Sequence, residues 1–277
     1  MIVSRPAHDG RTTEHQSRRS LTLHSTVAAV LGSGVTVLVH EATHLVAVLG
    51  LVGQGRLYPY GAQYDGELDG VSTAVVALAG PAVSLALGLT LLLTLSRARV
   101  VGPWHLVRLW CGASSYVVGA GYLFITPFGA GDTAIAVRAL DLPAWTAFVA
   151  AAVGLALCLL GARLVASRAL PLTDQDDRIA RALLLHPAWI GTVVNLGLML
   201  AYLLGSDAGF PLGQQVAVVS GYVVLLTLGP WSLPYLARRS PTSRTHLRLG
   251  RVPVVALLGL AVLIAVNLAL LPGLRIG

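Results

Sequence analysis

The sequence predicts an all-α polytopic membrane protein with six to seven transmembrane helices. Of its 277 residues, 55% are hydrophobic and only 11% are charged, and the mean hydropathy is +0.75. These values lie outside the range of soluble globular proteins. Long apolar runs recur along the chain, each long enough to cross a hydrocarbon core of about 30 Å as a helix. The runs cover residues 21–52, 71–95, 104–126, 143–167, 184–205, 212–235 and 252–272.

The distribution of arginine predicts the orientation of the chain in the membrane. All 19 basic residues are arginine, and the formal net charge is +7. They do not form one basic patch but lie between the apolar runs, so we expect no nucleic-acid partner. The loops 168–183 and 238–251 are rich in arginine, whereas the alternate connections hold only Arg56 and Arg138. By the positive-inside rule, this alternation fits seven spans with a cytoplasmic N-terminus.

Composition divides the chain into three segments. Residues 1–20 form a polar, arginine-rich N-terminal tail that would rest on an anionic membrane surface. Residues 21–142 hold nearly all the acidic and histidine side chains that fall within apolar runs. Residues 143–277 form additional transmembrane helices to which the sequence assigns no role, and Asn195 and Asn267 are among their few polar residues.

The first apolar run contains the segment HEATH at residues 40–44. On a helix, His40 and His44 lie one turn apart on one face, so both imidazoles can reach one metal ion. Glu41 lies about 100° round the helix, where it can act on water as a general base. These groups could instead pack helices, but ionisable side chains within a bilayer are costly and by default mark a functional site. We therefore predict one Zn²⁺ per chain, bound by His40 and His44.

A catalytic zinc site needs a third protein ligand and one position open to water. The first candidate is Asp132, which follows a break in the third run at TPFGAGD, residues 126–132. Irregular backbone at membrane depth is tolerated where it lines a cavity or is buried in protein. The alternative role of Asp132 is a helix N-cap. A second set of candidates, for which a solvated turn is the other interpretation, comprises Asp65, Glu67 and Asp69.

Gly80 and Pro81 interrupt the second apolar run within ALAGPAVSLALG, residues 77–88. A glycine permits close approach of a neighbouring helix, and a proline permits a kink. If successive helices alternate in direction, these residues, the HEATH segment and Asp132 all lie near one membrane face.

In order and type, HEATH, GPAVS (80–84) and TPFGAGD resemble the motifs of the site-2 protease family of intramembrane zinc metallopeptidases. That family has HExxH in one core helix, GPxxN in the next, and an aspartate after a proline-rich break in the third. The resemblance covers about residues 21–140. This chain has Ser84 in place of the asparagine and Gly-Asp-Thr in place of Leu-Asp-Gly around the third ligand. The literal LDG at 68–70 precedes the Gly-Pro motif and is interpreted as a decoy.

The resemblance implies a three-helix metalloprotease-like core over residues 21–142. The connection 53–70 would take the place of a membrane-associated β-hairpin that helps to hold substrate, and the substrate would be a membrane-embedded protein in a bacterial cell membrane. The implied site comprises the zinc ligands His40, His44 and Asp132, the catalytic base Glu41, and the substrate-binding residues Gly80, Pro81 and Ser84.

Two other functions fit the same residues. One is a metal-binding membrane protein without proteolysis, such as a pseudoprotease or a metal carrier. Ser84 in place of asparagine favours it, whereas Glu41 argues against it because zinc storage needs no general base. The other is a transporter or scaffold whose polar cluster only packs helices, and it predicts that Asp132 lies far from His40 and His44.

Overall fold

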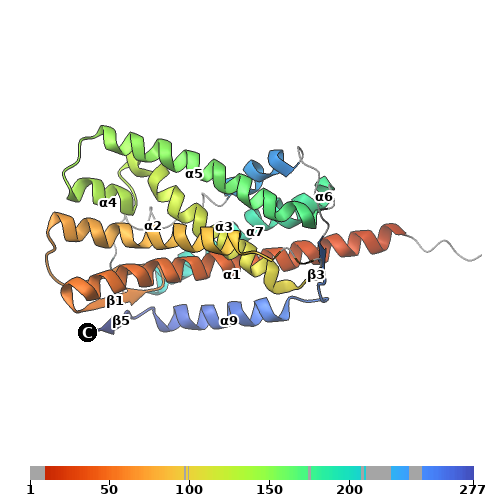
Figure 1. Cartoon of the computed structure of the whole chain (residues 1–277). Coiled ribbons are helices and arrows are strands. Elements are labelled where there is room, and N and C mark those ends of the chain that lie inside the picture. The colour runs from red at the N-terminus through yellow and green to blue at the C-terminus, as the bar shows by residue number, and fades with distance from the viewer. Residues whose placement is uncertain are drawn as a thin grey trace, which may run out of the picture.

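The computed structural model describes residues 10–96, 98, 100–173, 176–206, 209, 226–236 and 245–277, which form a bundle of long helices with two small β-sheets (Figure 1). The predicted all-α class is confirmed. Residues 226–236 are also helical. The remaining elements are α1 (Gly10–Val52), β1 (Gly55–Tyr58), β2 (Gly61–Gln63), α2 (Gly70–Leu93), β3 (Val100–Val101), α3 (Pro103–Phe124), the 3₁₀ turn Thr126–Phe128, α4 (Asp132–Ala139), α5 (Trp145–Ala169), the 3₁₀ turn Leu170–Leu172, α6 (Asp177–Ala180), the π-helical turn Arg181–Leu185, α7 (His186–Gly205), β4 (His246–Leu247), α9 (Val254–Ala269) and β5 (Leu274–Ile276).

The number of predicted spans is confirmed only in part. Within the described residues, four helical segments are long and apolar enough to cross a membrane. The helix α9 has 16 residues, fewer than the roughly 20 that a crossing requires. The predicted run 212–235 lies largely outside the described residues. The four segments are Arg18–Val52, Gly70–Leu93, Trp145–Leu172 and Asp177–Gly205.

The helix α3 is less apolar than α2 because it lies inside the bundle, where it packs against α1, α2 and α5. Its serine hydroxyls are buried and bond to α1. Ser114 Oγ lies 3.0 Å from Ser33 Oγ, and Ser115 Oγ lies 2.8 Å from Thr36 Oγ1. Such bonds between membrane helices contribute about 0.6 kcal/mol each on average. Hydropathy therefore understates how deeply α3 is buried.

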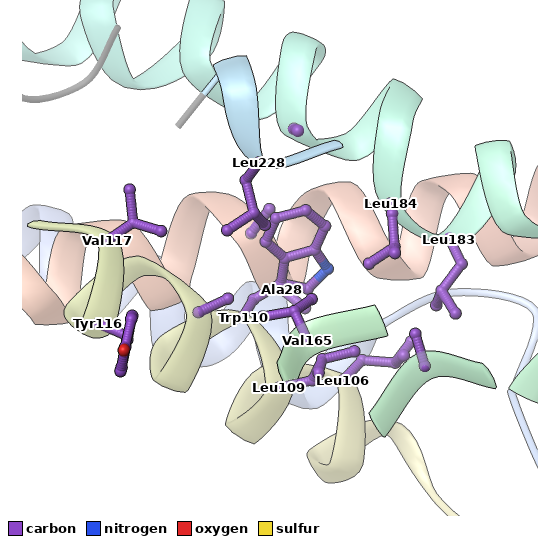
Figure 2. Packing of buried hydrophobic residues seen from close by; sticks show 14 of the residues in the cluster. Ala28, Leu106, Leu109, Trp110, Tyr116, Val117, Val165, Leu183, Leu184 and Leu228 are labelled. Atoms are coloured by element: carbon purple, nitrogen blue, oxygen red, sulfur yellow. The ribbon is translucent and has the colours of Figure 1, made fainter. Parts of the chain in front are cut away.

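A buried tryptophan joins the first helices to the later ones. The indole Nε1 of Trp110 donates to Ser25 Oγ at 2.7 Å, and Ser25 Oγ donates to the carbonyl oxygen of Leu183, also at 2.7 Å. Figure 2 shows the indole among side chains that include Val165 and Leu228. Because these residues come from α1, α3, α5 and the segments on either side of α7, the N-terminal and C-terminal parts share one core.

The larger sheet lies where α1 ends (Figure 1). Strands β1 and β2 form an antiparallel hairpin, within the connection 53–70 where the resemblance implied one. Strand β5, which the sequence did not indicate, pairs with the other edge of β1 and gives the order β2-β1-β5. At the opposite end of the bundle, β3 pairs with β4 in parallel.

Glycines allow α2 and α3 to pack backbone against backbone. A Cβ at Gly88 would overlap the backbone nitrogen of Tyr116, and a Cβ at Gly119 would lie 2.7 Å from both Leu85 N and Pro81 O. No flexible side-chain end can move aside at these contacts. The close approach brings α2 and α3 together beside α1, where the predicted ligands lie.

Replacement of Gly88 with alanine should therefore destabilise the protein by about 1–3 kcal/mol, the usual cost of overpacking. The matched control is Gly197→Ala on α7, where a Cβ would have nothing within 4 Å. Thermal unfolding in detergent micelles measures the difference. Equal melting temperatures for the two variants would contradict the close packing of α2 and α3.

Candidate metal centre

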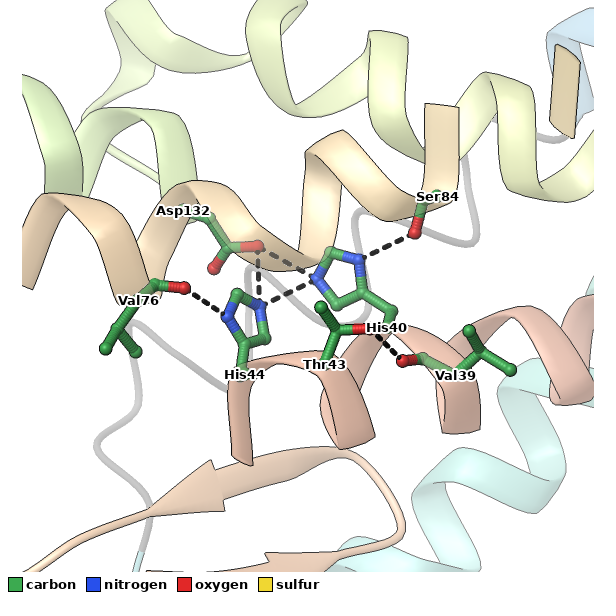
Figure 3. Close-up of polar contacts among 7 residues, drawn as sticks. All are labelled: Val39, His40, Thr43, His44, Val76, Ser84 and Asp132. Atoms are coloured by element: carbon green, nitrogen blue, oxygen red, sulfur yellow. Dashed lines mark hydrogen bonds and ion pairs between the residues drawn. The ribbon is translucent and has the colours of Figure 1, made fainter. Parts of the chain in front are cut away.

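Three potential ligand atoms converge between α1, α2 and α4 (Figure 3). The Nε2 atoms of His40 and His44 are 3.1 Å apart, and they lie 2.9 Å and 3.3 Å from Oδ2 of Asp132. Donors placed tetrahedrally at about 2.0–2.1 Å from a zinc ion are about 3.3 Å apart. The observed spacings are close to that value, so the group could hold a metal ion.

The second ring nitrogen of each histidine is fixed by another hydrogen bond. His44 Nδ1 donates to the carbonyl oxygen of Val76 at 2.7 Å, and His40 Nδ1 lies 3.0 Å from Ser84 Oγ. A carbonyl can only accept, so Nδ1 of His44 carries the hydrogen and its Nε2 keeps a free lone pair. Partners of this kind orient metal-binding imidazoles and raise their basicity.

The break after α3 brings Asp132 to the histidines. Pro127 lies in the 3₁₀ turn, and Gly129 and Gly131 have φ angles of 70° and 79°, which glycine adopts at little cost. Arg138 Nη1 donates to the carbonyl oxygen of Gly129 at 2.9 Å and closes the turn. The N-cap of α4 is Gly131, with no side-chain cap, and Asp132 is the first helical residue. Asp132 therefore faces the imidazoles, as a ligand would, and is not the N-cap.

The other acidic candidates lie in the turn before α2. Asp69 is the N-cap of α2 and accepts a hydrogen bond from the backbone nitrogen of Ser72 at 2.7 Å. That bond lowers the pKa of Asp69. Asp65 and Glu67 are exposed. The interpretation as a solvated turn is confirmed, and the LDG segment at 68–70 has a structural role at the start of a helix.

The residues expected to bind substrate lie beside the histidines or between helices. Gly80 lies against both rings, since a Cβ there would overlap Nε2 of His44 and come within 2.8 Å of His40 Cε1. Ser84 is 1% exposed and bonds to His40. The carbonyl of Pro81 faces Gly119 of α3. In this structure, Gly80 and Ser84 contact the histidines directly.

The sequence did not indicate two of the groups that contact the histidines. The ring of Tyr122 stacks on His40, with centroids 5.0 Å apart and planes 12° apart. The carbonyl of Val76 holds His44. The only sequence signal for Tyr122 was its place one turn before the break in the third run. A backbone carbonyl gives no sequence signal, because every residue has a carbonyl.

Glu41 lies beside this group in a buried position, 8% exposed. Its carboxylate makes no hydrogen bond within the described part of the chain, so it is available to water or a ligand. The side chain of Asp132 is 17% exposed, compared with 3% for His40 and 9% for His44. The centre is therefore most accessible on its Asp132 side.

Comparison with known proteins finds no matching family model, curated protein or solved structure. The position of Asp132 tests one of the functions predicted from the sequence. The transporter or scaffold hypothesis predicted that Asp132 lies far from the histidines, whereas the structure places it within 2.9 Å of His40. The protein thus combines apolar helices compatible with membrane insertion with a group of three residues that could hold a metal ion.

Replacement of Asp132 with alanine should weaken metal binding by more than the roughly 10–100-fold that loss of an outer-shell partner costs, because it removes a ligand. Asp65→Ala, at the exposed turn, is the control and should bind metal normally. Mass spectrometry on detergent-purified protein measures the metal content of the two variants. An unchanged content in the Asp132 variant would remove this residue from the ligand set.

Loss of the Ser84 hydroxyl should have a milder effect. Ser84→Ala frees the His40 ring to rotate and should lower metal affinity roughly 10–100-fold, as measured by competition with a chelator. Ser33→Ala is the control, because Ser33 is also buried and hydrogen bonded but contacts Ser114. Equal affinities in the two variants would show that Ser84 does not orient His40.

Proposed function

We propose that this protein is an intramembrane zinc metalloprotease that hydrolyses peptide bonds in or near transmembrane segments of membrane proteins. The observation that carries the proposal is the convergence of His40, His44 and Asp132 beside Glu41 within a bundle of apolar helices. Two imidazoles and one carboxylate at near-tetrahedral spacing suit Zn²⁺, and three protein ligands leave the fourth position open, as in catalytic zinc sites.

Peptide hydrolysis would combine a metal ion with side chains of this protein. A Zn²⁺ ion held by the three ligands would act as a Lewis acid that polarises the peptide carbonyl and makes water more acidic. Glu41 takes the proton as water attacks the carbonyl carbon and then delivers it to the leaving amine. Ser84 and the Val76 carbonyl keep the imidazoles oriented. Burial of the histidines limits contact with bulk water.

The substrate is a membrane-embedded segment that unwinds locally, because an intact helix holds its carbonyl oxygens in i to i−4 hydrogen bonds. The more exposed Asp132 side provides the approach to the metal centre. The sheet at the end of α1 offers a second contact, since extended peptides pair with strand edges. Both edges of β1 are already paired, so a substrate strand would add to the outer edge of β2 or β5.

We further propose six to seven spans in a bacterial cell membrane, with the N-terminus in the cytoplasm. The segregation of arginine supports this orientation. Arg108 donates to the carbonyl oxygen of Thr94, and Arg168 donates to that of Leu93, so both lie at the end of α2. The opposite end holds fewer arginines, including Arg56, which pairs with Arg275 across β1 and β5. The metal centre would then open toward the exterior.

Metal binding without proteolysis is the second candidate. The observation that favours it is the bond between Ser84 and His40, because Ser84 occupies the place of the asparagine in the resembling family and its hydroxyl is directed to a ligand. In that case the wild-type protein would bind zinc with no cleavage of membrane-embedded substrates.

Replacement of Glu41 with glutamine distinguishes the two candidates. The variant should retain its metal and lose about 10²–10⁴-fold in cleavage rate, the usual contribution of a general base. Glu67→Gln, on the exposed turn, should cleave normally. The assay uses proteoliposomes that contain a single-span reporter protein. Cleavage by Glu41→Gln at the wild-type rate would refute the protease assignment, and a zinc-loaded wild type that cleaves nothing would favour the second candidate.

A further inference from the structure

A second polar site lies between α1, α7 and α9, in a pocket with about 20 Å³ of room for water-sized molecules, enough for about one ordered water. Most of its wall is aliphatic. Its polar side chains are Asn195 and Tyr202 from α7 and Asn267 from α9. The whole chain contains only two asparagines, and both line this pocket.

Three polar atoms of the pocket have no partner among the described residues. The amide nitrogen of Asn195, the hydroxyl of Tyr202 and the amide oxygen of Asn267 are buried without a hydrogen bond to any described residue. The three residues are 4%, 6% and 6% exposed. Unpaired polar atoms are costly in apolar surroundings. Buried water typically satisfies about three such groups at once.

Close contacts show that α7 runs parallel to α1 and fix their relative height. The carbonyl of Leu183, just before α7, bonds to Ser25, and a Cβ at Gly191 would lie 3.2 Å from Ala29 and 3.8 Å from Val30. Residues on parallel helices rise by the same 1.5 Å each. Tyr202 follows Gly191 by as many residues as His40 and Glu41 follow Ala29 and Val30. Tyr202 therefore lies near the height of His40 and Glu41.

The face of α1 that lines the pocket leads to Glu41. Val30, Gly34 and Val37 line the pocket, and Glu41 is the next position on that face, because steps of four, three and four residues keep to one side of a helix. Side chains on a helix lean toward its N-terminus. The Glu41 side chain therefore leans back along α1 toward Val37, the nearest pocket-lining residue on that face, and Glu41 is 8% exposed.

We propose that the pocket between α1, α7 and α9 holds ordered water and supplies it to Glu41. Among the described residues no charged side chain lines the pocket, which suits a neutral ligand, and the unpaired donor, acceptor and hydroxyl match water. The inference rests on the proposed function, since each hydrolysed peptide bond consumes one water molecule. It gives α7 and α9, which lie outside the three-helix core, a role in the reaction.

Radiolytic footprinting tests for the water directly, without cleavage. X-rays convert bound water to hydroxyl radicals that oxidise adjacent side chains. Met199 lines the pocket although it is 2% exposed, whereas Trp110, equally buried, packs in the main core. We expect Met199 to be oxidised at least several-fold faster in the wild type than in an Asn195→Leu, Asn267→Leu double variant, with Trp110 slow in both. Equal Met199 rates, with Trp110 still protected, would overturn the proposal.

Kinetics test the supply of water. The double variant should bind metal normally and lose about tenfold in kcat with an unchanged KM, less than the roughly 10²–10⁴-fold expected without the general base. Thr192→Val, one turn from Asn195 but outside the pocket, should change neither kcat nor Met199 oxidation. An unchanged kcat after loss of the footprint would overturn the supply role. If Glu41→Gln cleaves as well as the wild type, the proposed function fails instead, while the footprint still reports whether water occupies the pocket.

Discussion

The contact of two imidazoles with one carboxylate is the constraint on which the surrounding structure depends. His40 and His44 come from α1, Asp132 comes from α4, and both helices must approach α2 closely for the three atoms to meet. That approach requires a residue without a side chain at Gly80, and it places Ser84 and the Val76 carbonyl within reach of the remaining ring nitrogens. In apolar surroundings an unpaired polar group is costly, and the ring nitrogens of His40 and His44 all have partners within the chain.

Sequence predicted most of this site because its signals are local. The spacing of His40 and His44 fixes a shared helix face, and the glycines and proline before Asp132 mark a backbone break that the structure contains. The number of crossings was harder to predict, since α3 owes its moderate hydropathy to hydroxyls that face α1. Strand β5, the stacking of Tyr122 and the Val76 carbonyl arise from contacts between distant segments, which no local pattern encodes.

Polar side chains also lie in α7 and α9, outside the core that resembles a metalloprotease. Asn195 and Asn267 lie in helices that composition alone would assign to lipid contact or packing. Placed against the Glu41 face of α1, they give this helix two polar sides, one directed to the group that could hold a metal ion and one to a pocket. The later helices thus bring polar groups to α1 although they contribute no residue to that group.

The shortness of α4 has a consequence for how the site assembles. A helix of eight residues has little stability of its own, and the fully buried apolar residues between it and α2 are three alanines, Ala74, Ala77 and Ala136. The link between its first residue and the histidines adds to this packing. A metal ion held by the three residues would therefore couple metal binding to the ordering of α4.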